Sequence, residues 1–451
     1  MTTTWQSTAL DRLMLCHLAL HDVGTALEYG RRSIAMSTQQ PDPTVRALSR
    51  FYYGLALHHS GRPEEAIEIW QQTGKHDSCT AAIALSKDPT TENIEHLRIL
   101  AKHEVRFSHH DEYGLSVLDY SFLGDNERLK TVAIEGLRRE FSHPDDNGLT
   151  LEMSRIEERI ANLLVETQRR KKYRETFQLT LRPILNKLAV SLPLGLSDDE
   201  VYIKGHAHRQ EGIDSLRQGY LRQRDMSSET CSLFDRLVML RYRDFKEEMT
   251  RLPRPHSGDD MQEVMHLRRQ YSALRDVTDM KEKDTQPEFL VFLSYRWLGK
   301  GSPDDRTNTQ YQRMLDALDL YLRMHPWLDQ DRVSVWLDVV CIDQVDLEVK
   351  QRGINALPLV VAQCNALISI LDSEYLSRAW CSVEVLMIQT LRNSYGVHEH
   401  WNYDYKTGIL AEAETIPPIN DDLDGLNLSY PEVDEPTVKF LVRQSRILAK
   451  T

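Results

Sequence analysis

The sequence predicts a multidomain protein that combines a helical, repeat-like N-terminal region with a C-terminal α/β domain. Three short apolar runs, rich in Val, Ile, Leu and Phe, begin at Phe289, Val333 and Leu367. Such runs predict strands that are buried on both faces, as in a parallel sheet covered by helices. Apolar residues at spacings of three and four lie between the runs and predict amphipathic helices. This alternation of strands and helices is typical of a doubly wound α/β unit.

Length and composition limit the classes of protein to which the chain can belong. Its 451 residues exceed one hydrophobic core, so we expect two to four domains. No apolar run approaches the roughly 20 residues of a membrane span, and the polar start lacks a leader, so we expect no membrane partner and a cytoplasmic location. The six cysteines form no CxxC pair, which favours a reducing compartment and argues against zinc or any other metal. A formal net charge of −13 argues against nucleic acid as a partner.

Residues 1–75 predict tetratricopeptide-like helical hairpins. The small residues Gly54, Ala56 and Ala66 let two helices approach closely, and the Gly61–Pro63 segment provides the break between them. An earlier copy of the same pattern covers residues 18–29. We expect this region to bind a protein partner.

The middle of the chain is assigned to two further regions. Residues 76–150 predict ankyrin-like repeats or an irregular helical array, because residues 111–120 resemble an ankyrin opening and residues 145–152 resemble a second one. Residues 151–285 are strongly charged and predict a helical connector, which ends in a hinge at residues 281–287. The α/β domain then occupies residues 286–451 and closes with an amphipathic helix near the C-terminus.

Polar residues follow the predicted strands at the points where ligands bind in doubly wound sheets. Ser294, Tyr295 and Arg296 end the first strand, and Asp338 follows the second. The loop after the third strand leads into a helix that carries Glu384. Because the carboxyl ends of parallel strands meet at one edge, we expect these groups to converge there.

Three segments of the α/β domain resemble Toll/interleukin-receptor (TIR) domains. Residues 292–296 (Phe-Leu-Ser-Tyr-Arg) resemble the opening motif of that family, and residues 336–338 (Trp-Leu-Asp) its second strand. Residues 377–384 resemble the helix that holds the catalytic glutamate of the family. The same segments are similar to fungal heterokaryon-incompatibility domains, a divergent TIR-like group. All three motifs in this order form a fairly specific signal that covers about the last third of the chain.

This resemblance implies a flavodoxin-like parallel sheet and an activity that cleaves the nicotinamide–ribose bond of NAD. Glu384 is then the catalytic residue, and NAD is a substrate, with no other cofactor required. The residues expected to bind NAD are Ser294, Tyr295, Arg296, Trp297, Asp338 and Trp380. The resemblance further implies self-association of the TIR-like domain and a role in innate immune or cell-death signalling.

Each of these assignments has a structural alternative. Glu384 is otherwise a surface glutamate, Trp380 and Tyr295 are packing residues, and Asp338 is more simply explained as a cap for the following loop. At the level of the protein, the alternatives are a non-enzymatic adaptor whose crevice is filled by Trp297 or Trp380, and a peptide-binding scaffold. Trp297 and the insertion at residues 298–303 depart from the family pattern in the loop over the substrate, as does the loop after Asp338.

Overall fold

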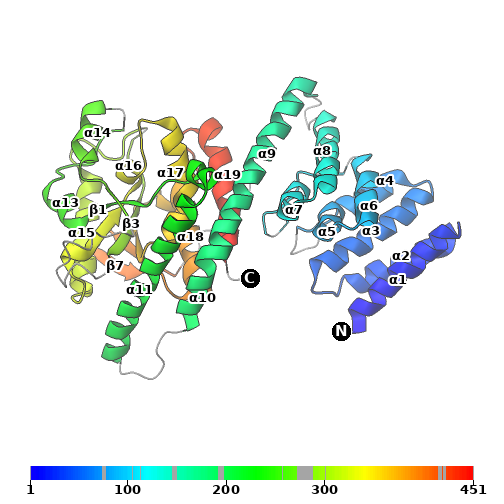
Figure 1. Ribbon diagram of the computed structural model, residues 1–451, viewed down its shortest axis with the longest axis horizontal. Coiled ribbons are helices and arrows are strands. Elements are labelled where there is room, and N and C mark those ends of the chain that lie inside the picture. The colour runs from blue at the N-terminus through cyan, green and yellow to red at the C-terminus, as the bar shows by residue number, and fades with distance from the viewer. Residues whose placement is uncertain are drawn as a thin grey trace. The chain divides into compact units, whose positions relative to one another are not determined.

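The chain forms two compact units, Met1–Lys171 and Lys172–Thr451, and a computed structural model gives their architecture (Figure 1). The structure describes residues 2–73, 78–103, 105–111, 113–144, 150–190, 198–255, 257–271, 288–299, 301–414, 419 and 423–449. The hinge expected at residues 281–287 and most of the second ankyrin-like opening lie outside the described residues.

The first unit consists of helices that pack in consecutive pairs. Its helices are α1 (Thr2–Ala19), α2 (Val23–Ser37), α3 (Pro43–His59), α4 (Pro63–Gln71), α5 (Ala81–Lys87), α6 (Thr91–Ala101), α7 (Val117–Leu123), α8 (Glu127–Ser142) and most of α9 (Met153–Thr176). Within residues 2–73, α1 packs against α2 and α3 packs against α4, so this part of the chain consists of helical hairpins. Residues 76–144 add the pairs α5–α6 and α7–α8, whereas α9 is a single long helix.

The close approach of α3 and α4 depends on a glycine, as the sequence predicts. A Cβ atom built on Gly54 would lie 2.2 Å from Trp70 Nε1, far inside van der Waals contact. The same indole nitrogen donates a hydrogen bond of 2.9 Å to the backbone oxygen of Phe51. Trp70 is fully buried, so a glycine opposite its ring lets this large side chain fill the space between the two helices.

The second unit contains a seven-stranded mixed sheet with the strand order β2-β1-β4-β3-β5-β6-β7. Its strands are β1 (Val238–Arg241), β2 (Arg269–Gln270), β3 (Phe289–Tyr295), β4 (Val333–Trp336), β5 (Ala366–Leu371), β6 (Glu399–Asp404) and β7 (Ile409–Glu412). The four central strands, β4, β3, β5 and β6, are parallel, and the three outer strands are antiparallel to their neighbours. The three apolar runs therefore form adjacent parallel strands, and this order of parallel strands is that of flavodoxin-like sheets.

Helices cover both faces of this sheet, with α15 on one side and α17, α18 and α19 on the other (Figure 1). The helices of this unit are α10 (Arg182–Val190), α11 (Asp198–Asp225), α12 (Ser228–Leu233), α13 (Tyr242–Glu247), α14 (Gly258–Met265), α15 (Thr309–Met324), α16 (Asp338–Cys341), α17 (Leu347–Ala362), α18 (Ala379–Tyr395) and α19 (Pro431–Leu448). A right-handed crossover places α15 opposite α17 and α18, because the chain moves from β3 to β4 in one direction and from β4 to β5 in the other.

The structure corrects the expectation that residues 151–285 form a helical connector. β1 pairs with β4 in this sheet, with Leu240 opposite Val335, and β2 extends the sheet beyond β1. One continuous hydrophobic core runs from Tyr173 to Leu448. The segment that precedes the expected boundary at residue 286 is therefore part of the α/β unit.

Candidate functional site

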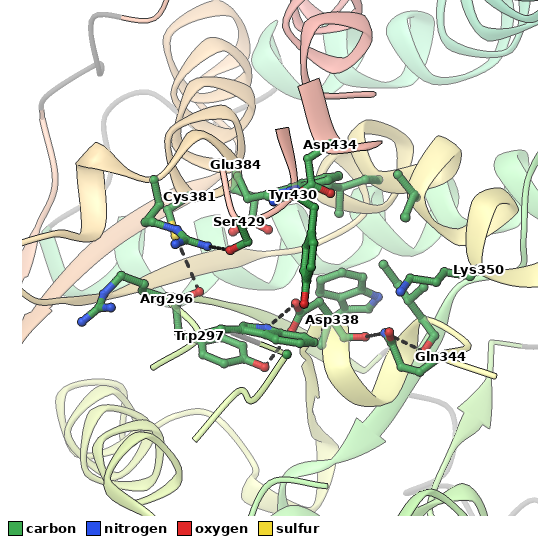
Figure 2. A pocket seen from close by; sticks show the side chains of 18 residues that line it. Arg296, Trp297, Asp338, Gln344, Lys350, Cys381, Glu384, Ser429, Tyr430 and Asp434 are labelled. Carbon is green, nitrogen blue, oxygen red and sulfur yellow. Dashed lines mark hydrogen bonds between the residues drawn. The ribbon is translucent and has the colours of Figure 1, made fainter. Parts of the chain in front are cut away.

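A cavity of about 200 Å³ opens at the carboxyl ends of β3 and β4, between these strand ends, α18 and the start of α19 (Figure 2). This is the edge where the polar residues were expected to converge. β3 lies between β4 and β5, so the crossovers that leave β3 and β4 run in opposite directions. Such a reversal opens a crevice in doubly wound sheets.

Glu384 lies on the first turns of α18 and lines this cavity. Its side chain is buried, with 9% of the residue exposed, and Ser294 Oγ donates a hydrogen bond of 2.5 Å to Glu384 Oε2. Burial raises the pKa of Glu384 to about 8; the Ser294 hydrogen bond lowers it, and the charge of Asp338 adds to the rise. A carboxyl group with so perturbed a pKa, in a cavity, is a candidate catalytic group.

Asp338 comes two residues after the last residue of β4 and begins the short helix α16. Its Oδ1 accepts hydrogen bonds from the Tyr295 hydroxyl at 2.7 Å and from the Val339 backbone nitrogen at 2.7 Å, and its Oδ2 accepts one of 2.9 Å from Trp297 Nε1. Burial raises the pKa of Asp338, although these three donors oppose the effect. Asp338 thus receives a local backbone hydrogen bond, and it also ties together two aromatic residues of the cavity wall.

The aromatic residues that the sequence assigned to the site line the cavity without filling it. Tyr295 is buried at 5% exposure, with its hydroxyl bound to Asp338, while Trp297 and Trp380 are half-buried on the wall. Trp380 lies one helical turn before Glu384, which puts both side chains on the face of α18 that borders the cavity.

Arg296 does not present a free guanidinium to the cavity. Its Nη2 lies 2.8 Å from Asp372 Oδ2, its Nε donates to the same carboxylate at 2.9 Å, and its Nη1 lies 3.2 Å from Glu374 Oε2. The hydrogen bond that Arg296 donates to Asp372 raises the pKa of Arg296. Figure 2 shows this guanidinium turned away from Asp338 and Lys350. The contact with NAD that was expected of this guanidinium is therefore replaced, in this structure, by a link from the end of β3 to the loop after β5.

Ser294 also differs from its expected position. The residue is 1% exposed and does not line the cavity. It lies behind Glu384 and holds that carboxyl group, so it supports the site from within the core and has no open face for a ligand.

The structure adds cations and a C-terminal wall that the sequence analysis did not identify. Lys350 of α17 and Arg378, which precedes α18, both line the cavity. Among the described residues, neither has a carboxylate within ion-pair distance; Arg378 donates to Ser429 Oγ. Arg378 lies within the TIR-like segment 377–384, so its place in the site could have been predicted from the sequence. No sequence motif surrounds Lys350, so its place in the site could not.

The segment before α19 completes the cavity from a distant part of the sequence. The Asn427 backbone nitrogen donates to Ser377 O at 2.7 Å, and the Ala379 nitrogen donates to Asn427 O at 3.1 Å. These bonds bring Tyr430 to the cavity, where it reaches toward Trp297 and Asp338 (Figure 2).

No group of His, Cys, Asp or Glu side chains within the described ranges is arranged to hold a metal ion. Of the described helices, none is both long and apolar enough to cross a membrane. Comparison with protein-family models, with curated proteins and with solved structures finds no match. The cavity geometry and the motif resemblance are therefore the observations from which a function can be inferred.

Proposed function

We propose that this protein is a TIR-like NAD glycohydrolase, which cleaves the bond between nicotinamide and ribose with Glu384 as the catalytic residue. The observation that carries the proposal is a buried carboxyl group, held by Ser294, that faces a cavity at the carboxyl ends of parallel strands. NAD is inferred as the substrate from the motif resemblance, and the cavity is inferred to be the place where it binds.

The chemistry requires one carboxylate and no general acid. The C–N bond breaks, its electron pair goes to the ring nitrogen, and nicotinamide leaves as a neutral amine. The ribose is left with oxocarbenium character, as in glycoside hydrolysis, and the Glu384 carboxylate stabilises that positive charge. Water then adds to the anomeric carbon, and its surplus proton passes to Glu384 and on to solvent.

The raised pKa of Glu384 favours a cationic substrate. With a pKa of about 8 the empty site holds Glu384 mainly protonated at pH 7. The oxidised nicotinamide ring carries a positive charge, and an opposite charge nearby favours the ionised carboxylate. Binding of this substrate therefore promotes the charged form of Glu384 that the reaction needs.

The walls of the cavity suit the remaining parts of NAD. Trp297, Trp380 and Tyr430 offer aromatic faces for a planar ring. Lys350 and Arg378 bind the phosphate oxygens of NAD, because both line the cavity and neither has a carboxylate within ion-pair distance among the described residues. The adaptor alternative expects a crevice filled by Trp297 or Trp380, and an open cavity between them argues against it.

Regulation and location belong to the same proposal. The helical pairs of the first unit bind a protein partner in the cytoplasm, and self-association of the TIR-like unit switches on the activity in immune or cell-death signalling. Clustering raises the effective concentration of neighbouring units, which promotes a site that requires assembly.

The test measures NAD consumption by the full-length protein, dilute and clustered on a surface. We expect the clustered wild-type protein to release nicotinamide, and Glu384→Gln to reduce turnover about a thousandfold because it removes the charge. Glu374→Gln is the matched control: Glu374 is exposed and does not line the cavity, so this variant keeps the activity. Clustered wild-type protein that leaves NAD intact would support the adaptor alternative, and an active Glu384→Gln variant would place the catalytic group elsewhere.

A further inference from the structure

A chain of buried polar side chains runs from Glu384 into the core of the sheet. Ser294 Oγ donates to Glu384, and the Tyr375 hydroxyl is hydrogen-bonded to the same Ser294 oxygen. The Tyr375 hydroxyl donates a hydrogen bond of 3.0 Å to Ser369 Oγ, which in turn lies 2.9 Å from His400 Nε2. Ser294, Tyr375, Ser369 and His400 are each no more than 2% exposed.

The series of hydrogen-bonded side chains ends, on the side away from Glu384, at the amide of Gln389. Gln389 Nε2 lies 2.6 Å from His400 Nδ1 and donates a hydrogen bond of 3.0 Å to the Ala413 backbone oxygen. Burial lowers the pKa of His400 to about 3, so its imidazole is neutral at physiological pH. A neutral ring held from both sides gives the chain a rigid end and no group that takes up a proton.

The sheet places these polar residues together, and sheet packing does not require them. Ser294 of β3 and Ser369 of β5 are direct partners in the parallel register, and β6, with His400, is the next strand. The neighbouring Leu293 of β3 and Ile368 and Ile370 of β5 are apolar and no more than 1% exposed. Buried polar groups are costly unless they are hydrogen-bonded, and this chain leads from the interior to one carboxyl group of the cavity.

We propose that Tyr375 is a positioning residue that holds Glu384 in place through Ser294, with Ser369 and His400 as its support. The inference rests on the proposed function and extends it to residues that do not line the cavity. Ser294 donates its one hydroxyl proton to Glu384, so its oxygen can only accept from Tyr375, whose single hydroxyl proton is shared between the oxygens of Ser294 and Ser369. A hydroxyl that accepts one hydrogen bond becomes a stronger donor in the next.

The test is Tyr375→Phe in the full-length protein, which removes the hydroxyl and keeps the ring. The first readout is the titration of the Glu384 carboxyl carbon by NMR with labelled glutamate, its signal assigned by its absence in Glu384→Gln. The second is kcat/KM for NAD from pH 6 to pH 9.5. We expect the titration midpoint to rise by about one pH unit, which means about tenfold lower kcat/KM at pH 7 and near-complete recovery at high pH.

Two further variants separate a positioning role from a structural one. Tyr311→Phe also deletes a buried hydroxyl, which donates to the Phe245 oxygen at 2.7 Å. Because Tyr311 is not part of the hydrogen-bonded series that leads to Glu384, we expect no shift in the titration midpoint of Glu384. Ser369→Ala removes the second acceptor of the Tyr375 proton and leaves that proton to Ser294, so we expect a smaller shift of the midpoint in the opposite direction. This variant also tests the proposal if Tyr375→Phe fails to fold.

The two readouts distinguish the failure of this inference from the failure of the proposed function. A Glu384 midpoint unchanged in both Tyr375→Phe and Ser369→Ala overturns the positioning role, whether or not NAD is consumed. A shifted midpoint in a protein that leaves NAD intact keeps the positioning role and overturns the glycohydrolase.

Discussion

At the scale of single residues, the burial of Glu384 has an energetic consequence besides its chemical one. A carboxyl group whose pKa is about 8 in the folded state and about 4.5 in the unfolded state binds a proton more tightly when folded. The contribution of Glu384 to the free energy of unfolding is therefore largest below pH 4.5, and it is lost as the pH rises through 8. A candidate catalytic residue thus lowers the stability of its own domain at neutral pH, as active sites commonly do.

We predict that stability falls more steeply with pH in the wild-type protein than in Glu384→Gln. Between pH 5.5 and pH 7.5 the buried carboxyl group costs the wild type about 1.4 kcal/mol per pH unit, or about 3 kcal/mol in total. Glutamine has nearly the same shape and does not titrate, so the variant lacks this loss. Denaturant unfolding at the two pH values, followed by tryptophan fluorescence, measures the difference. Equal losses in the two proteins would show that Glu384 has an ordinary pKa.

At the scale of elements, Arg217 joins α11 to the start of the parallel strands. The residue is fully buried. Its Nε donates to the Gln363 oxygen at 3.1 Å, its Nη1 donates to the Glu288 oxygen at 2.5 Å, and its Nη2 donates to Asn365 Oδ1 at 2.8 Å. Asn365 Oδ1 also accepts from the Leu290 nitrogen at 2.9 Å. One guanidinium therefore satisfies carbonyl groups at the beginnings of β3 and β5.

We expect Arg217→Ala to lower the free energy of unfolding by about 3 kcal/mol or more, because it leaves several buried acceptors without a donor and opens a cavity. Arg222→Ala on the exposed side of the same helix is the control, with an expected change within about 0.5 kcal/mol. Chemical denaturation of both variants measures these values. An Arg217→Ala variant as stable as the control would mean that α11 is not integral to the sheet.

At the scale of the whole molecule, the α/β unit begins more than a hundred residues before its first parallel strand. The second compact unit starts at Lys172, and its core includes side chains from Tyr173 onward. β1 covers the edge of β4, and an uncovered strand edge is prone to pair with other chains. A division at residue 286 would therefore remove residues that belong to the sheet and to its core.

We predict that a fragment of residues 172–451 folds, whereas a fragment of residues 286–451 aggregates or lacks a cooperative transition. The shorter fragment lacks β1, β2 and Arg217, and it exposes the apolar surface that α10–α13 cover. Size-exclusion chromatography and thermal unfolding followed by circular dichroism distinguish the two fragments. If the fragment of residues 286–451 were monomeric and melted cooperatively at the same temperature as the longer one, the division at residue 286 would be the correct one.

The sequence by itself determined the parallel strands, the intervening helices and the meeting of Asp338 and Glu384 at one edge of the sheet. These features follow from local patterns: continuous apolar runs define buried strands, spacings of three and four define helix faces, and strand ends define the binding edge. The sequence also predicted the hairpin that contains Gly54, because small residues on both sides of a Gly–Pro break are a local pattern.

Only the tertiary structure decided which partners these side chains take. Arg296 lines the cavity but its guanidinium binds Asp372, Ser294 lies behind Glu384, and Tyr430 reaches the site from the C-terminal segment. β1 was missed because a strand of four residues has too short a pattern to stand out in a charged helical region, and its hydrogen bonds come from β4, far along the chain. Long-range partners have no local periodicity, so they are settled only when the chain packs.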